Sequence, residues 1–208
     1  MRRIVFIGNC QMLALHDIYW RHVGAEAGDL LTYVPAYEAI TEEHGQLIAC
    51  ADVIVEHVFD MPPTADTAKV PAAAVRQFVP VVSAGFLWPF AGEAHPHNPV
   101  GPELGGGPYP GELGDAFLNR ALLRGEDVSE VVPRYLALDI ARVGRLDRRY
   151  ELFLDRQQQR DNICGYAIAG LIAEHFRTEQ VFLSPHHPNL RVTLALAEQF
   201  LVKMGASA

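Results

Sequence analysis

The first nineteen residues constrain the fold of this chain more than any other stretch. Residues 3–7 form a short apolar run rich in β-branched side chains, which is the composition of a buried strand. Gly8 ends the run, Asn9 can cap a helix, and residues 11–19 carry apolar side chains at helical spacing. We therefore expect Cys10 at the junction where a strand ends and a helix begins.

The expected position of Cys10 has chemical consequences. In a parallel α/β sheet, ligand sites collect at the carboxyl ends of the strands. A helix N-terminus also presents N–H groups and a partial positive charge, which favour a thiolate over a thiol and can stabilise an oxyanion. The alternative is that Cys10 is a small buried residue that closes the turn. Both interpretations stay open at this point.

Strands and helices alternate over the first part of the chain. After the first strand we expect strands over 29–34, 52–55 and 80–83, and helices over 38–50 and 72–78. This alternation predicts a doubly wound parallel sheet in a three-layer α/β fold. Glu56 and His57 follow the third strand, and we expect His57 in a solvated loop rather than in a pocket wall.

The second half of the chain departs from this pattern. Residues 85–111 are rich in aromatic side chains, proline and glycine, and we expect them to form a loop that covers the site at the strand ends. Helices are expected over 115–159, 162–176 and 190–204, with a last strand over 180–183. We predict one α/β domain over 1–208, with a helical insertion over 112–160.

Composition excludes several function classes. The formal net charge of −8, from 17 basic and 25 acidic residues, argues against nucleic acid as a partner. The three cysteines are too few for a disulfide scaffold and lack the spacing of a zinc finger. No signal peptide and no apolar run long enough to span a bilayer is evident, so we expect a cytoplasmic protein.

Cys10 and the pair His186 and His187 are expected at the carboxyl ends of the first and last strands. A thiol within hydrogen-bond reach of an imidazole is an activated nucleophile. The imidazole needs an orienting partner, and Ser184 lies three residues before His187. The oxyanion could be received by Asn9, by Gln11 and by the backbone N–H groups of residues 10 and 11.

A catalytic metal is the alternative use of the histidines. Nitrogen ligands could come from His95, His97, His186 and His187. No carboxylate lies at a recognised metal-ligand spacing from them, and short histidine pairs are common in a chain with nine histidines. We therefore expect no metal.

The order of these pieces resembles the plan of the SGNH, or GDSL-like, hydrolases. In that family the turn after the first strand carries a serine, and the last block reads Asp-x-x-His-Pro. Here Cys10 takes the place of that serine, and residues 184–188 take the place of the last block. Ser184 stands where the family has its aspartate, which suggests a Cys–His dyad with a weaker orienting group.

A closer resemblance covers nearly the whole chain. The sequence is similar to the WcbI-type capsular polysaccharide biosynthesis family in five short motifs: Gly-Asn-Cys-Gln at 8–11, Pro-Phe-Ala-Gly-Glu-Ala-His-Pro at 89–96, Tyr-Pro-Gly-Glu-Leu-Gly-Asp at 109–115, Arg-Asp at 160–161, and His-Pro-Asn at 187–189. The resemblance implies an SGNH-like core with a helical addition. It also implies binding of coenzyme A or acetyl-CoA and O-acetylation of a capsular sugar.

The resemblance also implies roles for individual residues. Cys10 is the candidate nucleophile and His187 the candidate base, while Gln11 and His95 are expected in the site. Contacts with coenzyme A cannot be placed by motif, and charge alone makes three arginines candidates: Arg76, Arg156 and Arg160.

These observations favour an acyltransferase that uses acetyl-CoA as donor and a sugar or nucleotide sugar as acceptor. Either Cys10, deprotonated by His187, takes the acetyl group first, or His187 activates the sugar hydroxyl directly. One alternative is an esterase or thioesterase, in which water replaces the sugar. The other is a non-catalytic module that binds a glycan or a nucleotide and needs no reactive thiol.

Overall fold

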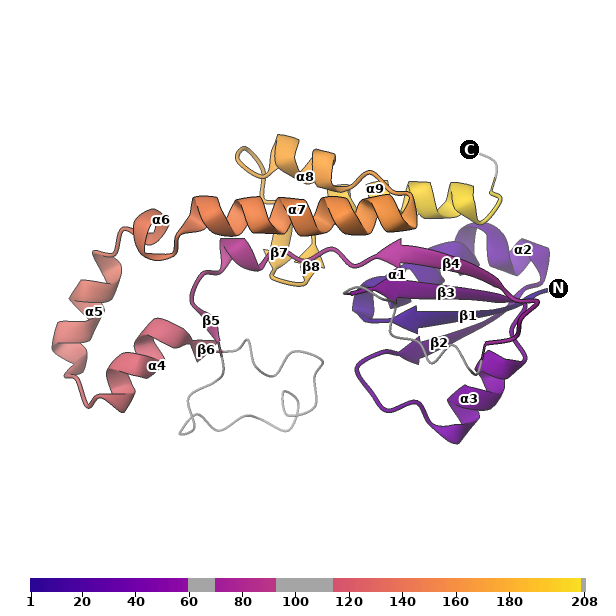
Figure 1. The fold of residues 1–208 in the computed structure, drawn as a ribbon, viewed down its shortest axis with the longest axis horizontal. Helices are drawn as coiled ribbons and strands as arrows, with labels where there is room; N and C mark the ends of the chain where they lie inside the picture. Colours follow the sequence, from indigo (N-terminus) through magenta and orange to yellow (C-terminus); the bar gives the residue numbers. More distant parts are fainter. Residues whose placement is uncertain (60–69, 93–113, 207–208) are drawn as a thin grey trace. The chain divides into compact units, whose positions relative to one another are not determined.

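Four parallel strands form the main sheet of the computed structural model, which describes residues 1–59, 70–92 and 114–206. The strands lie in the order β2-β1-β3-β4 and have these bounds: β1 Arg3–Gly8, β2 Leu30–Pro35, β3 Val53–Val58 and β4 Val75–Pro80. Val5 of β1 lies between Thr32 of β2 and Ile54 of β3. All four strands therefore end at the same edge of the sheet, and Cys10 follows an inner strand (Figure 1).

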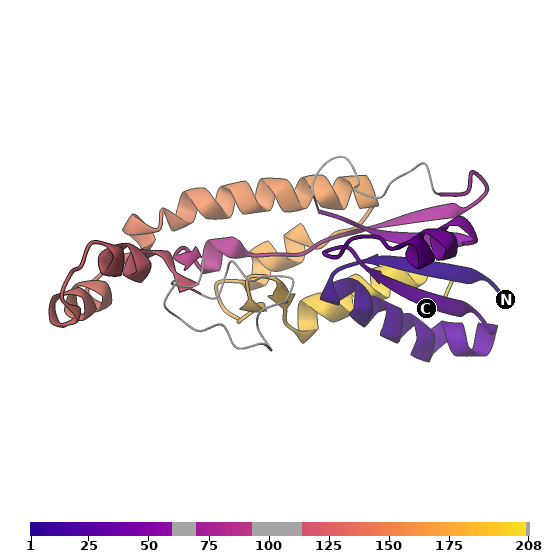
Figure 2. The ribbon, with the colours of Figure 1, turned by 90° about the horizontal axis from the view of Figure 1, so that it is seen from below.

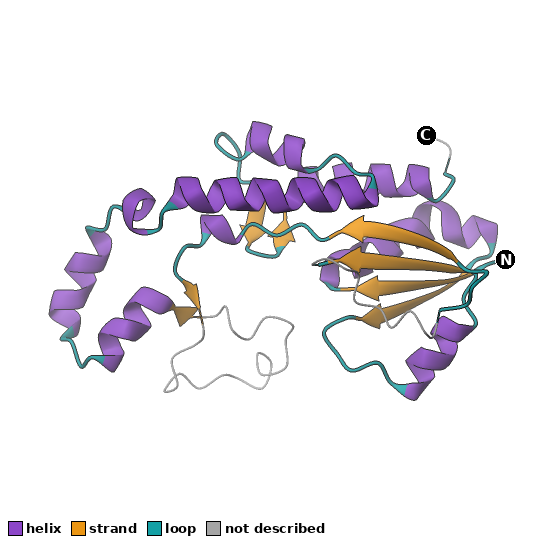
Figure 3. Ribbon diagram, viewed as in Figure 1, coloured by secondary structure: helices purple, strands orange, loops and turns teal. Residues whose placement is uncertain are grey.

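Helices flank this sheet, as secondary-structure colouring makes clear (Figure 3). The helices of the sheet's own unit have these bounds: α1 Cys10–Tyr19, the π-helical turn η1 Trp20–Gly24, α2 Ala25–Ala27, α3 Glu42–Ala49, α8 Ala169–His175 and α9 Leu190–Lys203. The predicted α/β class with a parallel sheet is confirmed.

Side chains that alternate along β1 pack on different helices. Phe6 points to α1 and α9, because its ring centroid lies 6.1 Å from that of Tyr19 and 6.0 Å from that of Phe200. Figure 2 shows the ribbons of α1 and α9 on the same side of the sheet. Val5 instead belongs to a buried cluster with Ile48 of α3. Because successive strand residues face opposite sides of a sheet, this alternation places α1 and α9 on one face and α3 on the other.

The fourth strand lies earlier than the sequence predicts. We expected a helix over 72–78 and a strand over 80–83, but β4 runs from Val75 to Pro80 and pairs with β3 along its whole length. The three alanines at 72–74 favour a helix locally. Pairing with β3 overrides that preference, and Pro80 at the strand end needs no N–H.

The last strand does not extend the parallel sheet. β7 (Phe182–Ser184) pairs antiparallel with the short β8 (His187–Pro188) in a sheet of two strands. The chain turns back at Pro185 and His186, so the expected strand over 180–183 becomes one arm of a tight hairpin. That hairpin presents His187 beside Ser184.

The predicted helix over 162–176 is divided in two. α7 (Leu146–Cys164) ends at Gly165, whose φ of 70° belongs to the left-handed region that glycine adopts readily. The buried carboxylate of Asp161 then accepts the N–H groups of Ile168 and Ala169, both at 2.7 Å, where α8 begins. This local capping explains why one apolar pattern yields two helices.

Residues 84–153 form a second compact unit, whereas 1–83 and 154–208 form the first. The elements of the second unit have these bounds: the 3-10 turn η3 Gly85–Leu87, β5 Ala91–Gly92, β6 Gly114–Asp115, α4 Ala116–Leu123, α5 Val128–Leu136, α6 Ile140–Val143 and the beginning of α7. Asp115 caps α4 and accepts the Tyr135 hydroxyl at 2.6 Å. The insertion predicted over 112–160 stays a prediction.

The loop expected over 85–111 lies mostly outside the described residues, which omit 93–113. None of the helices in the described part of the chain is both long enough and apolar enough to cross a membrane.

Candidate functional site

Cys10 and His187 lie beside each other although they are 177 positions apart in sequence. Cys10 is the first residue of α1, directly after β1, and its Sγ lies 3.5 Å from Nε2 of His187. His187 is the first residue of β8. The predicted meeting of thiol and imidazole is therefore present in the geometry, within hydrogen-bond distance for a sulfur atom.

The second ring nitrogen of His187 also has a partner. Its Nδ1 lies 2.5 Å from the hydroxyl oxygen of Ser184, across the β7–β8 hairpin. If Nδ1 carries the ring hydrogen and donates it to Ser184, then Nε2 has a free lone pair for the proton of Cys10. A neutral hydroxyl holds the ring without adding a negative charge, which a carboxylate would do.

Asn9 and Gln11 build the turn on either side of Cys10. Asn9 is 2% exposed and caps α1, because its side-chain oxygen accepts the Gln11 N–H at 3.0 Å. The Gln11 side chain donates to the backbone oxygens of Val82, at 2.7 Å, and His186, at 2.8 Å. It also accepts the Val82 N–H at 3.1 Å. An oxyanion could use this amide only if one of these bonds broke.

A small cavity opens beside the thiol. Its volume is about 170 Å³, and it is lined by residues of α1, β8 and α9: Cys10, Gln11, Ala14, Leu15, His187, Pro188, Thr193 and Leu196. Leu15 and Leu196 are buried, and Ala14 and Pro188 add further apolar surface to the wall. The reactive pair thus faces a largely apolar space, in which few water-binding groups compete for the thiol.

His57 is the residue near this turn that the sequence interpretation placed wrongly. It lies inside β3, not in a solvated loop, and is 1% exposed. Its Nδ1 accepts the backbone N–H of Asn9 at 3.3 Å. Burial lowers the pKa of His57 to about 3, so the ring is neutral at physiological pH. The sequence places His57 two residues after the β-branched run at 53–55, a position that fits the end of a strand as well as the start of a loop.

The three candidate arginines have different surroundings. Arg76 of β4 forms an ion pair with the buried Glu56 at 2.5 Å and stacks on the ring of Phe78. Arg160 of α7 donates from Nε to the carbonyl of Phe59 at 2.8 Å. Arg156 lies exposed on α7. Their role toward coenzyme A stays a prediction.

The other cysteines are not placed like Cys10. Cys50 is exposed at the end of α3, and Cys164 is buried at the end of α7. Burial raises the pKa of Cys164 to about 12, which keeps it a thiol.

Among the histidine candidates, His95 and His97 lie outside the described residues, and the side chain of His186 is half-buried next to His187. Within residues 1–59, 70–92 and 114–206, no three His, Cys, Asp or Glu side chains are grouped so that they could hold a metal ion.

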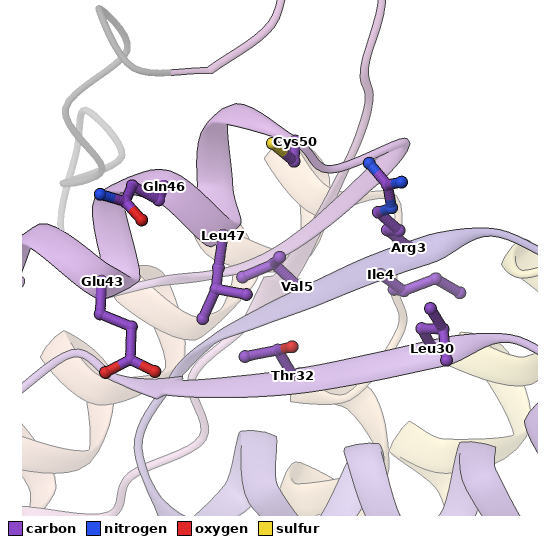
Figure 4. A pocket seen from close by; sticks show the side chains of 9 residues that line it. All are labelled: Arg3, Ile4, Val5, Leu30, Thr32, Glu43, Gln46, Leu47 and Cys50. Atoms are coloured by element: carbon purple, nitrogen blue, oxygen red, sulfur yellow. The ribbon is translucent and has the colours of Figure 1, made fainter.

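A larger cavity of about 520 Å³ lies on the α3 face of the sheet (Figure 4). It is lined by Arg3, Ile4, Val5, Leu30, Thr32, Glu43, Gln46, Leu47 and Cys50. Arg3 and Leu30 begin β1 and β2, so this cavity lies toward the strand starts, away from the carboxyl edge that carries Cys10.

Comparison with known proteins finds a solved structure of similar fold and a family model that matches the sequence. A solved structure of WcbI superposes with a TM-score of 0.72 at 14% sequence identity, covering 99% of this chain and 70% of that one. That protein is described as a novel polysaccharide biosynthesis enzyme, in a native form without a disulfide bond between coenzyme A and one of its cysteines. No curated protein matches the sequence significantly.

The structural likeness shows a shared fold. The sequence itself matches the model of the family described as "Polysaccharide biosynthesis enzyme WcbI" over residues 3–208, which is nearly the whole chain. The chain therefore belongs to the WcbI family of polysaccharide biosynthesis enzymes.

Proposed function

We propose that this enzyme transfers an acetyl group from acetyl-CoA to a sugar hydroxyl during polysaccharide biosynthesis, with Cys10 as nucleophile and His187 as general base. The observation that carries the proposal is the line of three groups in which Cys10 Sγ lies 3.5 Å from His187 Nε2 and His187 Nδ1 lies 2.5 Å from Ser184 Oγ. This arrangement of nucleophile, base and orienting group supports acyl transfer through a covalent intermediate on Cys10.

The first half of the reaction acylates Cys10. His187 takes the thiol proton at Nε2 while its Nδ1–H is held by Ser184. The Cys10 sulfur then attacks the acetyl carbon, the bond between that carbon and the donor sulfur breaks, and His187 returns its proton to the departing thiol. Because one thioester replaces another, the two leaving groups are alike and the step is close to balanced in energy.

The second half transfers the acetyl group to the acceptor. His187 takes the proton of a sugar hydroxyl, whose oxygen attacks the acetyl carbon on Cys10. The bond from that carbon to the Cys10 sulfur breaks, and His187 gives the proton to the sulfur. The same imidazole therefore serves as base and acid in both halves, which requires its ring to stay fixed by Ser184.

The cavity fits the reacting end of an acyl donor. Its volume of about 170 Å³ lies below the ~300–1,000 Å³ of pockets that enclose a drug-sized ligand, so the nucleotide end of coenzyme A would lie outside it. The solved WcbI structure is described by reference to coenzyme A and a cysteine of that protein. The proposal requires that Cys10 lie close to the thiol of the acyl donor.

Acylation can be tested by the mass of the intact protein after incubation with acetyl-CoA and acid quenching. We expect one added acetyl group, mapped by peptide mass spectrometry to Cys10, and none in Cys10→Ala. The matched control is Cys50→Ala, which removes an exposed thiol remote from His187 and should be acetylated like the wild type. Equal acetylation of Cys10→Ala and wild type would reject Cys10 as nucleophile.

The donor and the reaction type need separate measurements. Calorimetric titration with coenzyme A and acetyl-CoA should give micromolar binding, and absence of binding at millimolar ligand would overturn the donor assignment. Release of coenzyme A should depend on added sugar or nucleotide sugar. Equal release without any sugar would instead identify a thioesterase.

A further inference from the structure

His57 lies directly behind the turn that carries Cys10, yet it lines neither of the two cavities described above. It is 1% exposed, within β3, and its ring meets the ring of Phe59 edge-on at a centroid distance of 5.7 Å. A residue enclosed in this way does not reach a substrate. Its effect on the site must pass through the protein groups that it contacts.

One of those contacts fixes the backbone next to Cys10. The Asn9 N–H donates to Nδ1 of His57 at 3.3 Å, while the Asn9 side chain accepts the Gln11 N–H on the other side of Cys10. Since Nδ1 accepts a hydrogen bond, the neutral ring must carry its hydrogen on Nε2. Asn9 is thereby held from two directions, and Cys10 follows it immediately.

A second contact involves Gly8, which precedes Asn9. A Cβ on Gly8 would lie 2.5 Å from Nδ1 of His57 and 2.6 Å from the Cβ of Met12, both closer than real atoms approach. The imidazole therefore packs against the bare backbone of residue 8. Glycine at this position is explained by that close approach, because Gly8 is not among the glycines with positive φ.

The other ring nitrogen, Nε2, indicates that Nδ1 is the atom of His57 that contributes to the structure. In the described part of the chain Nε2 is buried without a hydrogen-bond partner. An orphaned buried donor costs stability, whereas an aliphatic side chain of similar size would cost less here. The imidazole offers one thing that an aliphatic side chain does not, which is the Nδ1 acceptor for Asn9.

We propose that His57 is a positioning residue that sets the distance from Cys10 Sγ to His187 by holding the Asn9 N–H and packing on Gly8. This inference rests on the proposed function of Cys10 and His187. His57 takes no proton during the reaction, and it acts only through the backbone of residues 8–10.

The main test replaces the ring while its volume is largely kept. In His57→Leu, which lacks the acceptor, we expect iodoacetamide to alkylate Cys10 about tenfold more slowly at neutral pH. We expect kcat for acetyl transfer to fall at least about tenfold with KM little changed, because misplacement of reacting groups affects the chemical step. His57→Asn, whose Oδ1 can replace Nδ1 as acceptor, should restore both rates to within about threefold of wild type.

A matched control separates positioning from general loss of packing. Val53→Ala removes buried volume from the same strand and the same face, four residues from His57, and should lower stability without slowing alkylation of Cys10. If folded His57→Leu alkylates at the wild-type rate, or if His57→Asn is as slow as His57→Leu, then the positioning role is wrong.

A measurement on the unaltered protein covers the case in which His57→Leu does not fold. The imidazole nitrogen NMR spectrum should show His57 as the neutral tautomer with hydrogen on Nε2. Hydrogen on Nδ1 would reject the proposal, because that nitrogen could not then accept the Asn9 N–H.

Alkylation needs no acyl donor, so the two proposals can fail separately. If His57→Leu slows alkylation but the wild type never accepts an acetyl group, then the positioning role stands and the acetyl-transfer function is rejected.

Discussion

Gln11 binds the backbone of His186, with its side-chain Nε2 donating to the His186 carbonyl at 2.8 Å. Gln11 follows Cys10 directly, and His186 precedes His187 directly. This hydrogen bond therefore joins the immediate chain neighbours of the two reacting residues. The same amide exchanges two hydrogen bonds with Val82, just beyond β4. A single buried side chain thus joins three stretches of chain at the carboxyl edge of the sheet.

Gln11→Leu should destabilise the protein and slow the reaction together. It removes three hydrogen bonds and leaves the Val82 and His186 backbone groups to find new partners, so we expect the free energy of unfolding to fall by about 2–4 kcal/mol. Urea unfolding measures this loss. Gln46→Leu, at an exposed position on α3, is the control and should change stability by less than about 0.5 kcal/mol. Equal midpoints for the two variants would contradict the role of Gln11.

The sequence predicted three strands of the sheet, β1, β2 and β3, but it placed the edge strand β4 wrongly. The apolar runs that form β1 and β3 are short, β-branched and bounded by turn residues, so local composition and burial agree. At β4 they disagree, since Ala72–Ala74 favours a helix and only pairing with β3 makes 75–80 a strand. Such pairing is a long-range contact that no local pattern carries.

The candidate site, like the sheet, could be predicted from the sequence only in part. The closeness of Cys10 and His187 could be predicted, because both lie beside strand ends with glycine, proline and capping residues around them. His57 could not, because a histidine after Val53–Val55 reads equally well as the start of a loop. The ring of His57 packs on the bare backbone of Gly8 on the neighbouring strand. The two residues are 49 positions apart in sequence, so no local pattern reveals this contact.

Ser184→Ala should slow acetyl transfer without unfolding the protein. The change removes the oxygen that lies 2.5 Å from Nδ1 of His187, so the imidazole loses the partner that fixes its tautomer and orientation. We expect kcat to fall by about tenfold, since a hydroxyl contributes less than a carboxylate in this place. Steady-state release of coenzyme A gives kcat. Ser129→Ala, at an exposed site on α5, is the control, and a Ser184→Ala rate equal to that control would remove Ser184 from the mechanism.

The three cysteines should differ in their reaction with iodoacetamide. Burial raises the pKa of Cys164 to about 12, so this thiol should stay unlabelled at neutral pH while the protein is folded. Cys10 and Cys50 are accessible, and the nearby imidazole of His187 should make Cys10 the faster of the two. Peptide mass spectrometry over a time course measures all three rates. His187→Ala should remove the advantage of Cys10, and a Cys10 that is no faster than Cys50 in the wild type would argue against the dyad.

Asp29→Asn should remove a pH-dependent part of the stability. Burial raises the pKa of Asp29, but hydrogen bonds from the side chain and backbone of Arg2 and from the Tyr19 hydroxyl outweigh burial and lower it from 3.8 to about 2. A pKa that is lower in the folded state stabilises the protein above the unfolded value of 3.8. That stability is lost as the pH falls through about 2. At neutral pH the shift corresponds to about 2 kcal/mol.

Urea unfolding at a series of pH values tests whether the contribution of Asp29 to stability falls in acid, as its lowered pKa predicts. Wild type should be more stable than Asp29→Asn by about 2 kcal/mol at neutral pH, and the difference should shrink as the pH falls from 3.8 towards about 2. Asp155→Asn, at an exposed position on α7, is the control and should follow wild type at every pH. A difference between wild type and Asp29→Asn that stays constant in acid would show that Asp29 acts through its shape and hydrogen bonds, and not through its charge.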